Sequence, residues 1–484
     1  MHSIYQLKRH ELGLALILGI LTGVCLVELS PGLDFLFLLS ILLLTGLILT
    51  PVIKNVLNRK FDPCEAKIVF SIFFGFFTLS PLISVYLHGI GVEFSRKPLI
   101  LQFFSREIDS TTIYASILCS LSLLFFYVGY HSRLPKLLCK HIPLPSIELS
   151  TKRIKWGIVF LFAVSIILFV ELMGSVGGLK SYLLAGYSSH LLVIGKSHLL
   201  ISYSWLAIVI LLYYFLGDVS NNKKRKFVAL TLLGIYVIFN GLVGRRRIPG
   251  MLLLALVIYK HYSEKKLTLK KLGIIIGLFL FYLFFFAALR GYNPLDYYQG
   301  VQDLLADFTP SMLLHPLTGG EQAPFEAFLT MVEKVPSQID YKFGATYLNL
   351  FLVWIPRGLW AGRPDTVHWY LETLFPETRE TMTGYGFFLL AEPYLNFGFI
   401  GPLLFMFILG VLYKSAYTVI RTQAQNKKVI LLYSIIIAYT PSLMRSESLA
   451  IKEFLLEFFL PALIVLAYGS RWKFLKRSSN NWKR

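Results

Sequence analysis

The chain has 484 residues, of which 56% are hydrophobic and 15% are charged, and its mean hydropathy is +0.64. Soluble globular domains carry about 25% charged residues, so the composition excludes an ordinary soluble domain and predicts an integral membrane protein. The formal net charge of +20 is not interpreted as nucleic-acid binding. In a multi-pass protein, Lys and Arg gather in the cytoplasmic loops, and we therefore expect no nucleic-acid partner.

Hydrophobic runs of roughly 20 residues predict about twelve transmembrane helices, because a helix of that length crosses the hydrocarbon core. No small-residue cleavage site follows the first run, so we interpret it as a retained helix and not as a signal peptide. The tenth run contains Pro393 and Pro402 and is expected to begin as a broken or re-entrant piece around Glu392. The runs lie near residues 12–29, 34–53, 67–88, 111–131, 154–173, 198–217, 227–243, 248–262, 271–289, 387–413, 429–444 and 453–469.

Basic clusters occupy alternate loops between these runs, and the positive-inside rule assigns such loops to the cytoplasm. An even number of helices then puts both termini on the cytoplasmic side. Residues 290–386 form the one long segment without a spanning run and are predicted to be a large extracytoplasmic loop. Since no internal repeat or low-complexity linker divides the chain, residues 1–484 are predicted to form a single membrane domain.

The two basic residue types divide unequally across the predicted membrane. About 31 of the 47 Lys and Arg residues lie inside and about 16 outside. The inside has roughly 9 Arg to 22 Lys, whereas the outside has roughly 10 Arg to 6 Lys. Topology requires positive charge of either type, but only the guanidinium group offers a planar fork of donors that fits phosphate or carboxylate. The outer arginines therefore predict binding of an anionic group.

These arginines lie in three outer segments. Gly244–Arg247 has the sequence GRRR between two hydrophobic runs, and positive charge on the outer side opposes the positive-inside rule. At the N-terminus of the next helix, the guanidinium charge would add to the backbone N–H groups and the helix dipole in binding an anion. Arg290 ends the ninth run, and Arg357 and Arg363 belong to IPRGLWAGRPDT, which its prolines and glycines make irregular. The alternatives are interfacial anchors that extend to lipid phosphates and a solvated turn. Because adjacent helical residues face different directions, we expect one or two of the three GRRR arginines to reach a site.

Three residues are candidates for a general base. Glu392 lies at the edge of the tenth run, where a carboxylate at membrane depth indicates either function or a structural ion pair. His368 follows Asp365 by three residues, so a short helix would place both on one face. A lone histidine in a loop is more often simply solvated. The sequence contains no nucleotide-binding fingerprint, and its four cysteines form neither a disulfide framework nor a metal site. We expect no cofactor and no metal.

At these residues the sequence resembles the oligosaccharide repeat-unit polymerases, the Wzy-type O-antigen and exopolysaccharide polymerase family. Four pieces carry the resemblance: the GRRR turn, the large late outer loop, the IPRGLW–GRP segment and the AEPYLNFGFIGP–ILG segment. They cover roughly residues 240–450. The N-terminal half is similar only in hydropathy and in its GSVGG loop. Some family members place arginine-rich motifs in two large outer loops, and here loop 174–197 contains no Arg, so the turn at 244–247 would substitute for one of them.

The resemblance implies an enzyme of the bacterial inner membrane whose active site faces the periplasm, with a fold like that of GT-C glycosyltransferases. It would transfer a growing glycan from undecaprenyl pyrophosphate onto the next lipid-linked repeat unit, with no nucleotide sugar and no required metal. Membrane lipid, a chain-length regulator and a repeat-unit flippase are the further partners implied. The pyrophosphate-binding arginines would be Arg245, Arg246, Arg247, Arg290, Arg357 and Arg363. Glu392 is the first candidate for the base, followed by His368 and Asp365.

Two alternatives stay open at this stage. An O-antigen ligase shares the architecture and the leaving group but transfers finished glycan to lipid A core. A transporter or flippase of lipid-linked glycan would place charges along a path within the helices. Most charges of this chain lie in loops, and repeated halves typical of transporters are not seen, so the polymerase is the favoured reading.

Overall fold

The structure is a computed structural model of the chain. It describes residues 35–57, 61–89, 108–140, 148–193, 195–289, 292, 294–306, 323–352, 355, 359–360, 366–375 and 386–471. Within these ranges the chain is helical, apart from one pair of two-residue strands, β1 (Glu148–Leu149) and β2 (Ser470–Arg471), which run antiparallel. The prediction of an all-α fold is thus confirmed for the described residues, with this small addition.

Seven described helices are long and apolar enough to cross a membrane, which makes the chain a multi-pass membrane protein. Six of them begin and end within a few residues of a predicted run, whereas the helix of the tenth run is shifted along the chain and spans Ile400–Thr422 instead of 387–413. The seven helices are α2 (Phe35–Leu57), α3 (Ala66–Gly89), α5 (Ser110–His131), α7 (Thr151–Ser175), α10 (Ser197–Val219), α11 (Lys223–Leu242) and α21 (Ile400–Thr422).

Four further predicted runs are also helical but shorter or interrupted. Two are α12 (Arg247–Ser263) and α13 (Leu269–Ala288), and a third divides into α22 (Lys427–Ala438) and α23 (Thr440–Leu443). The last run consists of α24 (Ala450–Glu453), a π-helix η6 (Phe454–Phe459) and α25 (Leu460–Tyr468). The first run, residues 12–29, lies outside the described residues. The full count of twelve spans therefore stays a prediction.

The tenth run is broken, as predicted, next to Glu392. Residues Ala391–Phe397 form a separate short helix, α20, and Gly398 ends it with a φ of +57° before α21 begins. A side chain at Gly398 would be strained, and its Cβ would lie only 2.9 Å from the Tyr341 hydroxyl. The break turns the run into a cap over the helix bundle and a span within it.

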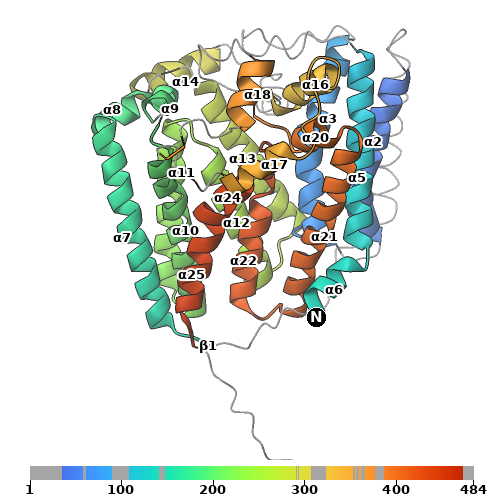
Figure 1. Cartoon of the computed structure of the whole chain (residues 1–484). Coiled ribbons are helices and arrows are strands. Elements are labelled where there is room, and N and C mark those ends of the chain that lie inside the picture. Colours follow the sequence, from blue (N-terminus) through green and yellow to red (C-terminus); the bar gives the residue numbers. More distant parts are fainter. Residues whose placement is uncertain are drawn as a thin grey trace, which may run out of the picture.

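The connecting segments gather at two ends of the bundle. Figure 1 shows α8 (Gly178–Leu184), α9 (Ser189–Leu192), α14 (Tyr297–Ala306), α16 (Ala323–Lys334) and α18 (Thr366–Leu374) at one end, which we call the upper end. The short helix α6 (Leu134–Lys140) and strand β1 lie at the opposite, lower end. The upper end carries the described helices of the segments 174–197 and 290–386, which are predicted to be extracytoplasmic. Which end faces the cytoplasm stays a prediction.

Close helix packing fixes the frame around the upper end. Helices α5 and α21 cross with their backbones in contact, because a Cβ at Gly129 would overlap the Phe407 carbonyl oxygen and one at Gly410 would overlap that of Phe126. Small residues commonly allow this approach between membrane helices. Helix α10 packs against α7, α11, α12 and η6. It brings the turn between α11 and α12 beside the last helical segment.

An ionic cluster ties the lower ends of four helices together. Asp218 at the end of α10 accepts a hydrogen bond from Tyr259 of α12 at 2.9 Å. The same carboxylate pairs with Lys226 of α11 at 2.5 Å and with Lys427 of α22 at 2.7 Å. Because the charges are paired at this end, the bundle is anchored there, away from the segments that carry the predicted site residues.

Candidate active site

The arginine turn, residues 244–247, joins α11 to α12 at the upper end. Gly244 has a φ of +71°, and the Arg245 N–H donates to the Asn240 carbonyl at 2.8 Å. A Cβ at Gly244 would lie 2.8 Å from the Tyr187 ring, which belongs to the 3-10 helix η1 (Gly186–Ser188) between α8 and α9. Glycine is therefore required here for both the backbone conformation and the contact, and the turn is packed against the α8–η1–α9 segment.

The three arginines of this turn point to three different neighbours. The Arg245 guanidinium carbon lies 5.0 Å from the centre of the Tyr203 ring on α10, a cation–π contact. Arg246 Nη1 donates to the Leu283 carbonyl of α13 at 3.1 Å. Arg247 forms a two-point pair with Glu453 of α24, in which Nη1 and Oε2 are 3.0 Å apart and Nη2 and Oε1 are also in contact.

Among the described residues, Arg245 forms no ion pair, and its guanidinium group contacts the Tyr203 ring. Arg247 already uses its fork on a carboxylate, the same geometry with which arginine binds phosphate. Arg245 is only partly buried and faces His190 of α9, whose pKa is lowered by burial and by the nearby guanidinium.

Two carboxylates of the last helical segment belong to this region and were not predicted. Glu453 pairs with Arg247, and Glu457 accepts a hydrogen bond from the Ser204 hydroxyl of α10 at 2.5 Å. Trp205 Nε1 donates to the Leu456 carbonyl at 3.1 Å within the π-helix. π-Helices are rare and often mark functional positions. The sequence did contain a signal, because two carboxylates within a predicted span are unusual.

Glu392 lies in a second cluster and is buried, with 3% of its surface exposed. Its Oε1 accepts hydrogen bonds from the Thr346 hydroxyl at 2.7 Å and the Ser448 hydroxyl at 3.0 Å. Its Oε2 accepts from the Ser448 N–H at 2.5 Å. Burial raises the pKa of this carboxyl, and the three donors lower it in part. Within the described residues its partners are neutral, and the choice between a structural ion pair and a functional role stays open.

Asn396 connects the same cluster to helix α17 (Ala345–Leu352), which carries Thr346. Its amide nitrogen donates to the Thr346 hydroxyl at 2.7 Å and to the Glu392 carbonyl at 2.8 Å. Its side-chain oxygen accepts from the Gly344 N–H at 2.8 Å. The Asn396 amide therefore orients the Thr346 hydroxyl, which donates a hydrogen bond to Glu392. These contacts fix α17, a helix of the large outer loop, against α20.

A single short segment, residues 444–453, joins the two clusters. Its Ser448 donates twice to Glu392, and its Glu453 pairs with Arg247. The Tyr439 hydroxyl stabilises this segment by donating a hydrogen bond to the Ala450 carbonyl at 3.0 Å. In Figure 1, α17 and α24 lie lower in the bundle than α16 and α18. Residues 444–453 thus connect Glu392, the predicted base, to the arginine turn.

The other predicted site residues are placed only in part. Arg290, Arg357, Arg363 and Asp365 lie outside the described residues. The His368 backbone belongs to α18, as the predicted short helix requires, but its side chain is not among those described. Asn349 Nδ2 of α17 donates to the Thr366 hydroxyl at the start of α18 at 2.5 Å. This contact ties the helix that carries His368 to the helix that supports Glu392.

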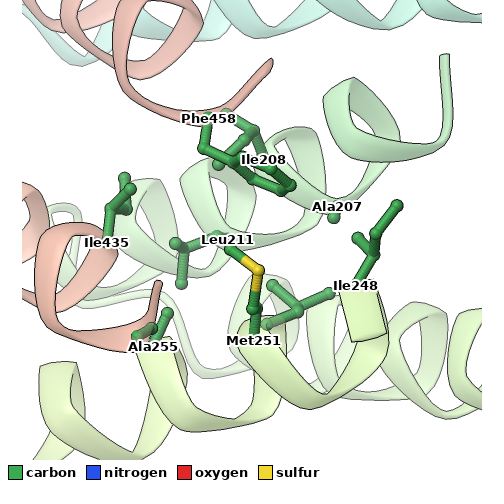
Figure 2. A pocket seen from close by; sticks show the side chains of 10 residues that line it. Ala207, Ile208, Leu211, Ile248, Met251, Ala255, Ile435 and Phe458 are labelled. Atoms are coloured by element: carbon green, nitrogen blue, oxygen red, sulfur yellow. The ribbon is translucent and has the colours of Figure 1, made fainter. Parts of the chain in front are cut away.

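A small pocket between α10, α12, α22 and η6 is apolar throughout. Figure 2 shows Ile208, Leu211, Met251 and Phe458 directed into it, and its other lining side chains are also aliphatic. It offers no acid, base or cation.

A family model for the O-antigen polysaccharide polymerase Wzy matches residues 14–476. The chain belongs to that family. The match covers both halves of the chain, whereas the motifs alone had indicated residues 240–450. This Wzy-family protein is accordingly a membrane glycosyltransferase-type enzyme that polymerises lipid-linked polysaccharide repeat units. Comparison with curated proteins and with solved structures gave no match.

Proposed function

We propose that this Wzy-family enzyme works at the extracytoplasmic surface of the bacterial inner membrane, as one membrane domain of about twelve helices with cytoplasmic termini. The donor is a glycan chain on undecaprenyl pyrophosphate, and the acceptor is the non-reducing end of the next lipid-linked repeat unit. The observation that supports this most is the linkage of the Arg245 turn and Glu392 through residues 444–453.

The proposed reaction exchanges one bond of the sugar's anomeric carbon for another. The bond from that carbon to the pyrophosphate oxygen breaks, and its electron pair leaves with the pyrophosphate. An acceptor hydroxyl forms the new glycosidic bond and gives its proton to a base. Negative charge grows on the departing diphosphate, so fixed guanidinium groups stabilise the transition state more than the ground state. We assign this role first to Arg245, and with it to Arg290, Arg357 and Arg363.

Arg246 and Arg247 complete the proposed anion site by orienting the turn. Their donors are directed to the Leu283 carbonyl and to Glu453, so either would have to exchange that partner to contact pyrophosphate. In the proposed mechanism Arg246 and Arg247 keep Arg245 in place. This agrees with the expectation that only one or two of the three arginines reach the substrate. Arg247 would also bind the pyrophosphate if the substrate displaces Glu453 from it.

Glu392, His368 and Asp365 are the proposed candidates for the base. For Glu392 to accept a proton from the acceptor, a substrate hydroxyl must take the position of a present donor within hydrogen-bond reach. The Ser448 hydroxyl, at 3.0 Å, is the longest of its three hydrogen bonds and is the one we expect to be exchanged. The raised pKa of Glu392 increases its affinity for a proton. His368 and Asp365 would act from the α18 side.

The proposed partners follow from the substrate. The undecaprenyl tail requires that the site be reachable from the lipid, and a repeat-unit flippase must deliver the lipid-linked unit to the outer surface. A chain-length regulator is the third proposed partner. No nucleotide sugar, metal or nucleic acid takes part in the proposed reaction.

The test is a reaction of purified protein with the lipid-linked repeat unit that accumulates in cells lacking it. We expect a ladder of longer glycans and one undecaprenyl pyrophosphate released for each new linkage. Arg245→Ala should leave single repeat units while the protein remains in the membrane, and Arg290→Ala and Arg357→Ala should do the same. Normal long glycan from all three variants would contradict the proposal. Transfer of finished glycan to lipid A core would favour a ligase instead.

A further inference from the structure

The upper end contains a concentration of buried polar atoms that lack partners. Around the arginine turn, five buried side-chain nitrogen and oxygen atoms of the described residues have no hydrogen-bond partner. An unpartnered buried polar atom is costly, so natural proteins keep few of them. The five atoms are Tyr182 Oη, Ser189 Oγ, His190 Nε2, Tyr203 Oη and Asn240 Oδ1.

Several contacts place these groups around Arg245. The rings of Tyr182 and Tyr203 have centroids 6.5 Å apart, and the Arg245 guanidinium lies over the Tyr203 ring. His190 is close enough for the guanidinium to lower its pKa, after the larger effect of burial. Asn240 accepts the Arg245 N–H on its carbonyl. The groups come from α8, α9, α10 and α11, and Ser189 is next to His190 on α9.

The hydrogen-bonding character of the group can be assigned. His190 Nδ1 lies 2.8 Å from the Tyr187 carbonyl, which can only accept, so Nδ1 carries the proton and Nε2 of the neutral ring is an acceptor. Asn240 Nδ2 donates to the Tyr236 carbonyl at 2.9 Å, which leaves Oδ1 as a second acceptor. Tyr182, Ser189 and Tyr203 add three hydroxyls. Two acceptors, three hydroxyls and a guanidinium do not suit a bare phosphate, which offers acceptors only.

We propose that the α8–η1–α9 segment and Arg245 form a binding site for a glycosyl phosphate, the sugar that carries the phosphate in the lipid-linked repeat unit. The phosphate contacts Arg245, and the sugar hydroxyls donate to His190 and Asn240 and exchange hydrogen bonds with the tyrosine and serine hydroxyls. The Tyr182 and Tyr203 rings contribute aromatic surface beside the sugar. This inference rests on the proposed function and adds the residues that recognise the sugar.

Entry to the site requires movement of the α8–η1–α9 segment, because the five atoms are covered in this structure. Glycines in left-handed conformations flank it: Gly177 and Gly178 before α8, with φ of +83° and +92°, and Gly195 after α9, with φ of +77°. Such positions absorb changes in backbone angle at little cost. The segment can therefore lift from the Arg245 turn and close over a sugar.

The experiment measures binding of two probes to purified full-length protein: the lipid-linked repeat unit, and inorganic pyrophosphate, which has no sugar. Tyr182→Phe and Ser189→Ala each remove one oxygen and keep the remaining side chain. Each should weaken repeat-unit binding about three- to tenfold, the effect of one lost hydrogen bond, and leave pyrophosphate binding unchanged. The control is Tyr236→Phe, whose hydroxyl already donates to the Tyr203 carbonyl at 2.9 Å. It should lower thermal stability without a selective change in binding.

The outcomes separate this inference from the proposed function. Unchanged repeat-unit binding in Tyr182→Phe and Ser189→Ala would overturn the sugar site, since the hydroxyls would then be occupied by structural water only. Equal losses for both probes would also overturn it. If Arg245→Ala weakens binding of both probes while the hydroxyl variants bind both normally, Arg245 keeps its proposed role in anion binding and the sugar site is refuted. If Arg245→Ala changes the binding of neither probe, the proposed function itself is refuted.

Discussion

Exchange of the charges of Arg247 and Glu453 tests how the arginine turn is kept in place. The pair has two contacts, one of 3.0 Å, and joins residues 206 positions apart in the chain. Hydrogen bonds to charged groups contribute about 1.5–3 kcal/mol, whereas exposed ion pairs contribute about 0.2–1 kcal/mol. Because the two side chains are 46% and 26% exposed, we expect a coupling free energy of about 1–2 kcal/mol.

The perturbation is a double-mutant cycle with Arg247→Glu, Glu453→Arg and the double variant. Each single variant places like charges together, and Arg247→Glu adds a carboxylate near Glu457 as well. Each should lower the free energy of unfolding, measured by reversible denaturation in mixed micelles. The double variant should recover most of the loss, since the reversed pair also places a carboxylate at the N-terminus of α12, where the helix dipole favours it.

The same variants are assayed for glycan chain length in cells that lack the native protein. If Arg247 acts through the turn, chain length should follow stability and recover in the double variant. Additive losses of stability, with no coupling beyond about 0.3 kcal/mol, would refute the structural role of the pair. Recovered stability with no polymer would identify Arg247 as a direct ligand of the substrate.

Two further predictions concern the Glu392 cluster and the turn glycine. Glu392→Gln should cost about 1–3 kcal/mol, because the amide cannot accept from every present donor. Since burial raises the pKa of Glu392, the folded protein binds more protons than the unfolded chain between the ordinary glutamate pKa of about 4.3 and the raised pKa of the folded state. Wild-type stability should therefore fall relative to Glu392→Gln as pH rises through that range; parallel stability–pH curves would contradict this. Gly244→Ala should cost about 1–3 kcal/mol and weaken repeat-unit binding through its clash with Tyr187, whereas Gly234→Ala, with open space around it, should not affect binding.

The hydrophobic runs predicted the membrane frame well because each span must satisfy its own backbone hydrogen bonds. The predicted runs 111–131 and 154–173 became Ser110–His131 and Thr151–Ser175. The break beside Glu392 was predicted from Pro393 and Pro402; in the structure Pro393 lies in the first turn of α20, and Gly398 ends that helix. These features depend on residues near each other in sequence, and composition and local sequence suffice for them.

The internal partners of the site residues could not be predicted in the same way. The contacts of Arg247 with Glu453 and of Glu392 with Ser448 join segments that are distant in sequence, and no local pattern indicates them. The excess of arginine outside the membrane predicted an anion site but did not distinguish Arg245 from its two neighbours. The π-helix at Phe454–Phe459 also lacks a sequence periodicity of its own. The carboxylates Glu453 and Glu457 were visible in the sequence, but their partners were not.

The most direct test of the account is the affinity of purified protein for undecaprenyl pyrophosphate, measured for the wild type, Arg245→Ala and a matched control. The control is Arg225→Ala, which removes the same charge near the lower end, where Arg225 Nη1 donates to the Ser220 hydroxyl at 3.1 Å. We predict at least about a tenfold loss of affinity for Arg245→Ala and none for Arg225→Ala. Equal affinity in all three proteins would contradict the claim that Arg245 binds the diphosphate.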